Sequence, residues 1–519
     1  MSEIVKRPKI DRVDFCVDEN IWGHRLYDEQ LPHLTVLEFL GVLGSNLDKP
    51  LRPHEGIGGA VKFKPQRQIR LRGLLFNNPY VESVSESALS DEEKWRQWHE
   101  KFDQGRTGNG DGIGDLAYLR QTFANFDDFA KAIELLRSSA FETRSNKRWS
   151  SKFVFPFGPD ALYEDLAIDS RGNMSNDRRF FARSGELLYL ILTRAKRGAQ
   201  LGDILAERLF ERSTPMNQLA RALQGEPQSA EDPRVSGYLP EAANPRFDQI
   251  CEDWLSVLSR DMPIYDALEH LIAITGFNML LYFLERAKRF AGDDEPVEIV
   301  CEIVSKNSRK VRALSGDSYL WNQGLPEKAV RAHIESIRQV PAWIDAASRE
   351  FPDAERVRVM QEVFQWPPEE GRDDDDYSVR SPDDLVDELV KLALLRHAQH
   401  VGKIHASWSR GIGLSSRRLS RRTRYAPNDR FLKAIVVAIV DDRMQFDEFL
   451  AEAKRRYGLV IGDAEGAHLV EKKSVDQGEL SENRENLEER LIGLGLVRRL
   501  SDSCSFVENP FAFEEVAAC

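Results

Sequence analysis

Cationic side chains concentrate in one stretch of an otherwise acidic chain. The 519 residues carry 72 Lys and Arg against 85 Asp and Glu, a formal net charge of −13. Between Leu389 and Asn428 there is no Asp or Glu, and the positive residues there are Lys391, Arg396, Lys403, Arg410, Arg417, Arg418, Arg421, Arg422 and Arg424. Because planar guanidinium groups bind phosphate oxygens through paired N–H donors, this stretch predicts contact with a polyanion.

Four of these arginines have a spacing that suits one side of a helix. If residues 415–424 are helical, positions i, i+1, i+4 and i+5 of this set lie on the same side. The four residues are Arg417, Arg418, Arg421 and Arg422. The nearby rings of Trp408 and Tyr425 add surfaces on which bases stack.

The alternative is that these arginines pair with the chain's own carboxylates, above all Asp373–Asp376. In that case the acidic run masks the basic one in the free protein. The phosphate interpretation predicts nucleic-acid contact through Lys403, Arg410, Arg417, Arg418, Arg421, Arg422 and Arg424.

Other patterns that suggest metal or phosphate chemistry do not have the required spacing. His397, His400 and His405 are three and five residues apart with no carboxylate between them, whereas paired helical metal ligands favour i, i+4. The glycine-rich segment 108–115 lacks the final acid of a calcium loop and the Gly-Lys-Ser/Thr of a phosphate loop. We therefore predict ordinary helix histidines, a surface turn, and neither a metal site nor a cofactor.

A metal-dependent nuclease is the main catalytic alternative. Glu298 and Glu302 share one side of a predicted strand over residues 297–304, and Lys306 follows. The three residues between Glu302 and Lys306 depart from the acid-x-Lys arrangement of such sites. We expect a solvated strand face here and no catalytic centre.

Composition excludes several classes of protein. Five dispersed cysteines without a C-x-x-C pair support neither a disulfide framework nor a zinc ribbon. The first residues lack the apolar stretch of a signal peptide, and the apolar run 271–284 is shorter than a membrane span. We expect a cytoplasmic protein in which this run forms a buried helix.

The elements that position these residues are mostly helical. Residues 68–72 alternate polar and apolar as a strand does. Asn125 is placed to cap one helix, and a second is expected from about residue 185 to residue 197. Prolines in segment 224–246 indicate a linker or long loop. Ser381, followed by Pro382 and two acids, starts a helix after the acidic run.

The C-terminal part has a recognisable order of elements. Helices are expected over about 430–441 and 447–457, and a third begins near Ser481. Two short strands then turn at residues 501–503. The stretch LGLVRRLSDSCSFVENP resembles the third-helix exit and the wing of the winged helix-turn-helix superfamily, and the resemblance covers about residues 428–510.

The resemblance implies a third helix that lies in the DNA major groove. Here that helix is acidic, since it carries Glu482, Glu485, Glu488 and Glu489. Carboxylates are repelled by phosphates, so base readout by this helix is not expected. Arg498 and Arg499 of the wing are candidate backbone contacts, and docking of a partner protein is the favoured role.

Together these patterns predict a mainly α, multidomain α+β protein. We expect a mixed α/β region (1–223), a proline-rich linker or loop (224–246), a helical domain with a short strand (247–365), an acidic linker and helix start (366–388), and a basic segment with a winged-helix-like domain (389–519).

The expected function is a non-catalytic accessory or adaptor subunit of a nucleic-acid-handling complex. DNA is favoured over RNA, partner proteins bind the C-terminal domain, and no membrane is involved. The context fits prokaryotic genome maintenance or phage defence only by general resemblance. The alternatives are a nuclease with a dispersed site in the first 365 residues and a purely protein-binding scaffold.

Overall fold

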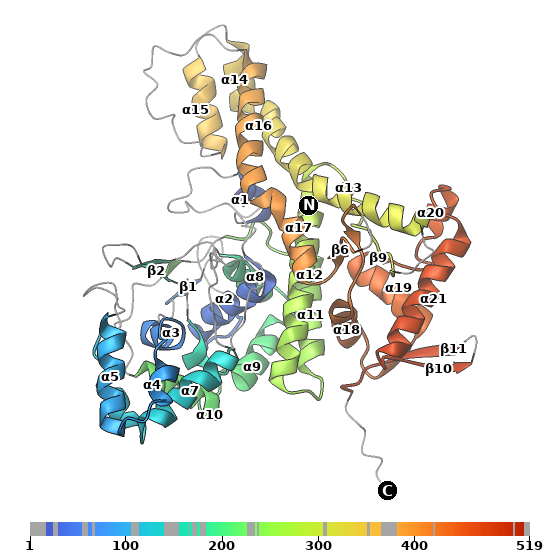
Figure 1. Cartoon of the computed structure of the whole chain (residues 1–519). Helices are drawn as coiled ribbons and strands as arrows, with labels where there is room; N and C mark the ends of the chain where they lie inside the picture. Colours follow the sequence, from blue (N-terminus) through green and yellow to red (C-terminus); the bar gives the residue numbers. More distant parts are fainter. Residues whose placement is uncertain are drawn as a thin grey trace.

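The long apolar helix α12 (Ile264–Phe290) forms the centre of the structure, a computed structural model of the whole chain (Figure 1). The structure describes residues 17–23, 30–53, 61–64, 68–104, 114–139, 155–163, 166–168, 174–176, 183–225, 234–235, 238–304, 309–349, 353–364, 381–418, 421–501 and 504–512. Most of these residues are helical, and a few small sheets join them, which confirms the predicted mainly helical class.

Helix α12 confirms the buried helix predicted over residues 271–284. Among the described residues it is the one helix long and apolar enough to cross a membrane, but 89% of its apolar window is buried inside the protein. The helices packed around it are α2 (Pro32–Gly44), α11 (Pro245–Leu258), α13 (Arg309–Glu335), α17 (Val401–Gly411) and α18 (Asp429–Ile439). Burial on all sides explains why the run lacks a polar face.

The first part of the chain consists of short helices beside this core. They are α1 (Val17–Trp22), α3 (Ile69–Phe76), α4 (Val81–Ser85), α5 (Asp91–Gln104), α6 (Tyr118–Thr122), α7 (Phe126–Ser138), α8 (Ser184–Thr193), α9 (Gly198–Leu209) and α10 (Pro215–Gln224), with a 3₁₀ turn at Pro159–Ala161. Two small antiparallel pairs accompany them: β1 (Lys62–Phe63) with β4 (Arg234–Val235), and β2 (Leu166–Ile168) with β3 (Met174–Asn176).

The strand predicted over residues 68–72 is wrong, because helix α3 begins there. Leu71, Leu74 and Leu75 are buried at helical spacing, which five alternating residues were too few to reveal. The Gln224 side chain accepts a hydrogen bond from the Leu71 amide at 3.0 Å. A distant side chain therefore satisfies a backbone donor in the first turn of the helix.

Two other local predictions in this region have different outcomes. Asn125 caps α7 by accepting from the Asp128 amide at 2.8 Å, as predicted. The helix expected over residues 185–197 ends earlier, at Thr193, and α9 begins at Gly198. At the start of α8 the Glu38 carboxylate accepts from the amides of Arg183 and Gly185, at 2.9 and 2.6 Å. A carboxylate at this position complements the positive end of the helix.

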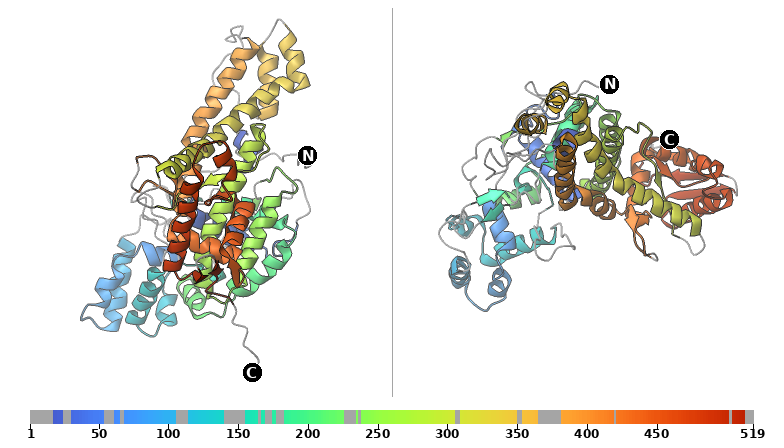
Figure 2. Two further views of the ribbon diagram at one scale, coloured as in Figure 1. Left: turned by 90° about the vertical axis from the view of Figure 1, so that its right-hand side faces the viewer. Right: turned by 90° about the horizontal axis from the view of Figure 1, so that it is seen from above.

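The segment after α13 extends away from the core as an arm (Figures 1 and 2). The arm contains a 3₁₀ turn (Ser336–Gln339), α14 (Pro341–Ser348), α15 (Asp353–Phe364) and α16 (Pro382–Gln399). Ser381 caps α16 by accepting from the Asp384 amide, which confirms the predicted helix start. The acidic run Asp373–Asp376, residues 226–233 and 236–237 of the linker 224–246, and the glycine-rich residues 108–113 lie outside the described residues.

The C-terminal elements follow the predicted order. They are α18, β8 (Arg443–Gln445), α19 (Phe446–Tyr457), β9 (Leu459–Val460), α20 (Ala467–Glu471), α21 (Gln477–Gly493), β10 (Val497–Ser501) and β11 (Cys504–Glu508). Asn428 caps α18, and β8 completes an antiparallel sheet in the order β10-β11-β8. The third helix begins four residues before the predicted Ser481.

A parallel strand pair joins the middle of the chain to this C-terminal part. Strand β5 (Ile299–Val300) pairs with β9, so the predicted strand over 297–304 is only two residues long. The buried Asn483 side chain of α21 binds backbone groups that directly follow both strands. Its amide donates to the carbonyls of Cys301 and Ile461 at 3.0 and 2.9 Å, and its oxygen accepts from the Ile303 amide at 2.8 Å.

Most of the buried apolar side chains form one large cluster from Val17 to Val507, and Val311, Val475 and Leu480 form a small second one. The large cluster includes residues from the predicted segments 1–223, 247–365 and 389–519, so these segments pack closely on one another. The boundaries between them stay predictions.

We expect Asn483→Ala to lower the free energy of unfolding by about 3 kcal/mol, because it leaves buried backbone groups without partners. Glu485→Ala is the matched control, since Glu485 is exposed on the same helix. Urea denaturation of both variants checks this. Equal stabilities for the two variants contradict the role given to Asn483.

Candidate functional site

The basic segment forms a hairpin, so the helix considered for residues 415–424 does not form. Strands β6 (Ser415–Ser416) and β7 (Arg424–Tyr425) pair antiparallel, with Ser415 opposite Tyr425. Leu419 is the only large apolar residue between Ser415 and Arg424, so a helix here has no apolar face to bury. The hairpin instead buries its ends, at Leu414 and Tyr425.

The four clustered arginines lie on the segment that connects these strands, and all four are exposed. They are Arg417, Arg418, Arg421 and Arg422. Arg417 Nε donates to Thr423 Oγ1 at 3.1 Å across the hairpin. Within the described part of the chain, no carboxylate pairs with Arg417, Arg418 or Arg421. We call the described residues of this segment, 417–418 and 421–422, the arginine hairpin.

The fifth arginine of the predicted set, Arg424, has a different role. Its side chain is 1% exposed, and its Nε donates to Glu302, which is fully buried. Arg312 Nε also donates to Glu302, at 2.8 Å, and Arg424 Nη2 donates to the Arg418 carbonyl at 2.8 Å. The prediction that Arg424 contacts an outside phosphate is therefore wrong, because its charge is neutralised inside the protein.

The predicted stacking surfaces are also buried. Trp408 is 1% exposed and Tyr425 is 0% exposed, so neither ring can stack on a base. The Tyr425 hydroxyl lies 2.6 Å from His405 Nε2 and accepts from Asn322 Nδ2 at 3.0 Å. The Tyr425 carbonyl accepts from Ser315 Oγ and from the Glu302 amide, at 2.7 and 2.9 Å. Tyr425 therefore fixes the base of the hairpin to α13 and α17.

Burial also removes the charge of two nearby histidines. Desolvation lowers the pKa of His405 to about 3 and that of His397 to about 4. Both are neutral at physiological pH and contribute no charge to a phosphate site. Among the described residues, no group of three or more His, Cys, Asp or Glu is placed to hold a metal ion.

Helix α17 adds two further cationic side chains of the predicted set. Lys403 and Arg410 are exposed and seven residues apart, so they lie on the same face of the helix. Arg410 and Arg417 both lower the pKa of the Tyr319 hydroxyl against the larger effect of burial, which places both guanidinium groups near Tyr319. The start of the arginine hairpin therefore lies close to the end of α17.

The two acids of the nuclease alternative, Glu298 and Glu302, have different partners. Glu302 forms ion pairs with Arg312 and Arg424, whereas Glu298 Oε2 lies 2.9 Å from His468 Nε2. Lys306 lies outside the described residues. The sequence indicates Glu302 as a possible catalytic acid, but no local pattern indicates its ion pair with Arg424, because the two residues are 122 positions apart.

The two arginines of β10 differ in their ion pairing. Arg498 and Arg499 are both exposed on β10. Arg499 Nε donates to Glu488 of α21 at 3.1 Å, so part of its charge is already neutralised. The acidic face of α21 stays outward at Glu485 and Glu489, both of which are exposed.

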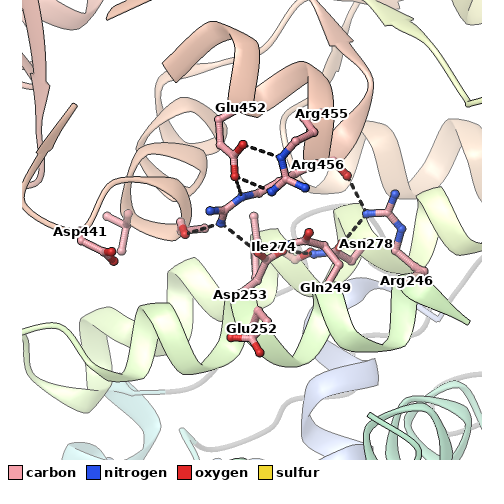
Figure 3. A network of polar contacts seen from close by, with 12 residues as sticks. Arg246, Gln249, Glu252, Asp253, Ile274, Asn278, Asp441, Glu452, Arg455 and Arg456 are labelled. Carbon is pink, nitrogen blue, oxygen red and sulfur yellow. Dashed lines mark hydrogen bonds and ion pairs between the residues drawn. The ribbon is translucent and has the colours of Figure 1, made fainter. Parts of the chain in front are cut away.

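Sequence reasoning missed a second polar region, where α11 and α12 meet α19 (Figure 3). Asp253 is 0% exposed and accepts from Gln249 and Asn278, at 2.8 and 2.6 Å. Arg246 Nη1 donates to Asn278 Oδ1 and to the Arg456 carbonyl, at 3.1 and 3.0 Å. Desolvation raises the pKa of Asp253 to about 6, although its hydrogen bonds and Arg456 oppose the shift.

We expect Glu302→Ala to lower the free energy of unfolding by about 3–5 kcal/mol, because it leaves the Arg424 charge buried without a partner. Arg424→Met in the same chain removes that charge, so the double variant should recover stability relative to Glu302→Ala. A double-mutant cycle by urea denaturation measures this coupling. Additive effects contradict it.

The pH dependence of stability should change in Asp253→Asn. The Asp253 carboxyl keeps its proton up to about pH 6 in the native state, but only up to about pH 4 in the unfolded chain. The stability that Asp253 contributes therefore falls as the pH rises between these values. The stability of the variant relative to the wild type should therefore rise over this window, by at most about 1.4 kcal/mol per pH unit. Denaturation at several pH values measures it. Asp266→Asn, at an exposed position, should show no such change.

The comparisons with known proteins place no further constraint on this site. No protein-family model matches the chain. No curated protein and no solved structure is significantly similar to it. The functional conclusion therefore depends on the geometry described above.

Proposed function

We propose that this chain is a non-catalytic accessory or adaptor subunit of a nucleic-acid-handling complex. The observation that carries the proposal is the arginine hairpin, whose four guanidinium groups are exposed while its base is fixed by a buried ion pair. A chain with a formal charge of −13 repels a polyanion as a whole. A local cluster of exposed arginines provides a surface for the phosphates of a polymer despite this charge.

The arginine hairpin suits backbone contact better than base readout. Its side chains come from a short exposed segment, and the aromatic rings that stacking requires are buried. Lys403 and Arg410 extend the positive surface along α17. We expect binding without sequence preference, with DNA as the favoured nucleic acid, and a strong dependence on salt.

The C-terminal elements support a winged-helix-like docking module. Their order is helix, strand, helix, strand, two helices and then two strands, and β8 joins β10 and β11 in one sheet. Helix α21 is used internally, because Asn483 binds the β5 and β9 exits and Arg484 pairs with Asp447. Its outer face is acidic and repels DNA. A partner protein with a basic surface is the better fit, and genome maintenance or phage defence is the context we propose.

The test removes the four positive charges of the arginine hairpin. It compares the DNA affinity of that variant with that of a variant from which four positive charges are removed at other positions. We expect alanine at all four positions 417, 418, 421 and 422 to reduce the affinity for a DNA duplex and to lower the salt slope by about 3–4. The control variant replaces four exposed arginines outside the site, namely Arg96, Arg120, Arg221 and Arg358. Both variants change the net charge by the same amount.

Fluorescence anisotropy with a labelled duplex over a range of salt concentrations gives the measurement. Equal binding by the two variants contradicts the assignment of the arginine hairpin. No salt-sensitive binding by the wild type favours the purely protein-binding scaffold. Cleavage of the duplex with magnesium or manganese, lost in a folded Glu302→Gln variant, favours the nuclease.

A further inference from the structure

A polar cleft lies on another part of the molecule, between the helices of the middle region and the C-terminal part. Its volume is about 450 Å³, which is within the usual range for small-molecule sites. Helices α9 and α11 supply one wall, and the end of α18 together with α19 supplies the other. The lining residues are Arg197, Gln200, Ile204, Gln249, Glu252, Leu255, Ser256, Ser259, Ile439, Asp441, Arg455 and Arg456.

Three guanidinium groups meet at this cleft, and each is held by neighbouring side chains. Arg197 Nη1 donates to Glu252 at 2.5 Å, and its Nε donates to Gln200 at 2.9 Å. Arg455 forms a two-point contact with Glu452, at 2.6 Å for each nitrogen, and Arg456 Nε donates to the same carboxylate (Figure 3). The positions of the guanidinium groups are therefore fixed before any ligand arrives.

These contacts do not use all the donors. A guanidinium has five N–H groups on three nitrogens. Within the described part of the chain, the contacts of Arg197 and Arg455 each involve two nitrogens, which leaves Nη2 of Arg197 and Nη1 of Arg455 for a ligand. The side chains are 46% and 66% exposed, so a ligand can reach them.

The rest of the wall is of two kinds. Gln200, Gln249, Ser256 and Ser259 are neutral and polar, while Ile204, Leu255 and Ile439 are aliphatic. The carboxylate of Asp253 below orients Gln249, whose Nε2 donates to it at 2.8 Å, so the Gln249 oxygen remains as an acceptor. The three lining arginines face two lining acids, Glu252 and Asp441, and Glu452 behind the wall pairs with two of the arginines, so the site supplies oriented N–H donors and no net positive charge.

We propose that this cleft binds a small molecule that carries a phosphate monoester. The phosphate lies between Arg197 and Arg455, where charge-assisted hydrogen bonds from two sides hold it. The uncharged part of the ligand lies along Ile204, Leu255 and Ile439. This site is independent of the arginine hairpin, so either assignment can fail without the other.

Isothermal titration of the full chain with adenosine monophosphate, inorganic phosphate and adenosine tests the proposal. We expect saturable binding of the monophosphate and weaker binding of free phosphate, which separates the phosphate contacts from those of the aliphatic wall. We expect no binding of adenosine, because it lacks the anion. Binding of phosphate alone also supports the assignment, as it uses the same two arginines.

The variants Arg197→Ala and Arg455→Ala should each weaken binding about tenfold or more, since each removes charged donors to the phosphate. Arg221→Ala is the control, because Arg221 is exposed on α10 away from the cleft lining. Thermal melting confirms that the variants fold. We expect Arg455→Lys to weaken binding less than Arg455→Ala, because lysine keeps the positive charge but lacks the planar guanidinium that binds phosphate through two N–H groups.

Three results overturn the proposal. The first is an absence of saturable binding of both the monophosphate and phosphate at millimolar concentrations. The second is adenosine binding as tight as that of the monophosphate. The third is unchanged affinity in both alanine variants.

Discussion

The arginine hairpin depends on one buried carboxylate. Glu302 is fully inaccessible and lies between the guanidinium groups of Arg424 and Arg312. A buried charge of this kind is tolerated only when it is paired and hydrogen-bonded, and the loss of one partner costs several kcal/mol. This ion pair brings a strand exit, the start of α13 and the hairpin to one point. The exposed arginines can therefore repel one another without opening the base of the hairpin.

The same short segment, residues 299–303, also holds the C-terminal part in place. It pairs with β9 on one side and is bound by Asn483 of α21. The Glu302 amide donates to the carbonyl of Tyr425, so backbone and side chain both hold β7. The hairpin and the C-terminal elements β9 and α21 consequently share one anchor.

The sequence predicts features that depend on nearby residues. The caps at Asn125 and Ser381 are confirmed because each side chain accepts from an amide three residues away. The helical spacing of the arginines over 415–424 is not realised, because the segment has no apolar face that a helix could bury. The site could be predicted as a cluster of charges but not as a structure. The partner of Arg424 is 122 residues away, and burial of this arginine follows only from the fold.

The two groups of arginines differ in how they are restrained, and this difference suggests different ligands. In the cleft, carboxylates fix the arginines, so little side-chain entropy is lost when a small anion of defined shape binds. On the hairpin, Arg417, Arg418 and Arg421 have no carboxylate partner among the described residues. Under the proposed function, side chains that no carboxylate holds can follow phosphates along a backbone whose sequence and shape vary. Carboxylate pairing therefore reduces the net positive charge of the cleft but fixes its geometry, whereas the hairpin keeps the charge that the proposed contact with a polymer requires.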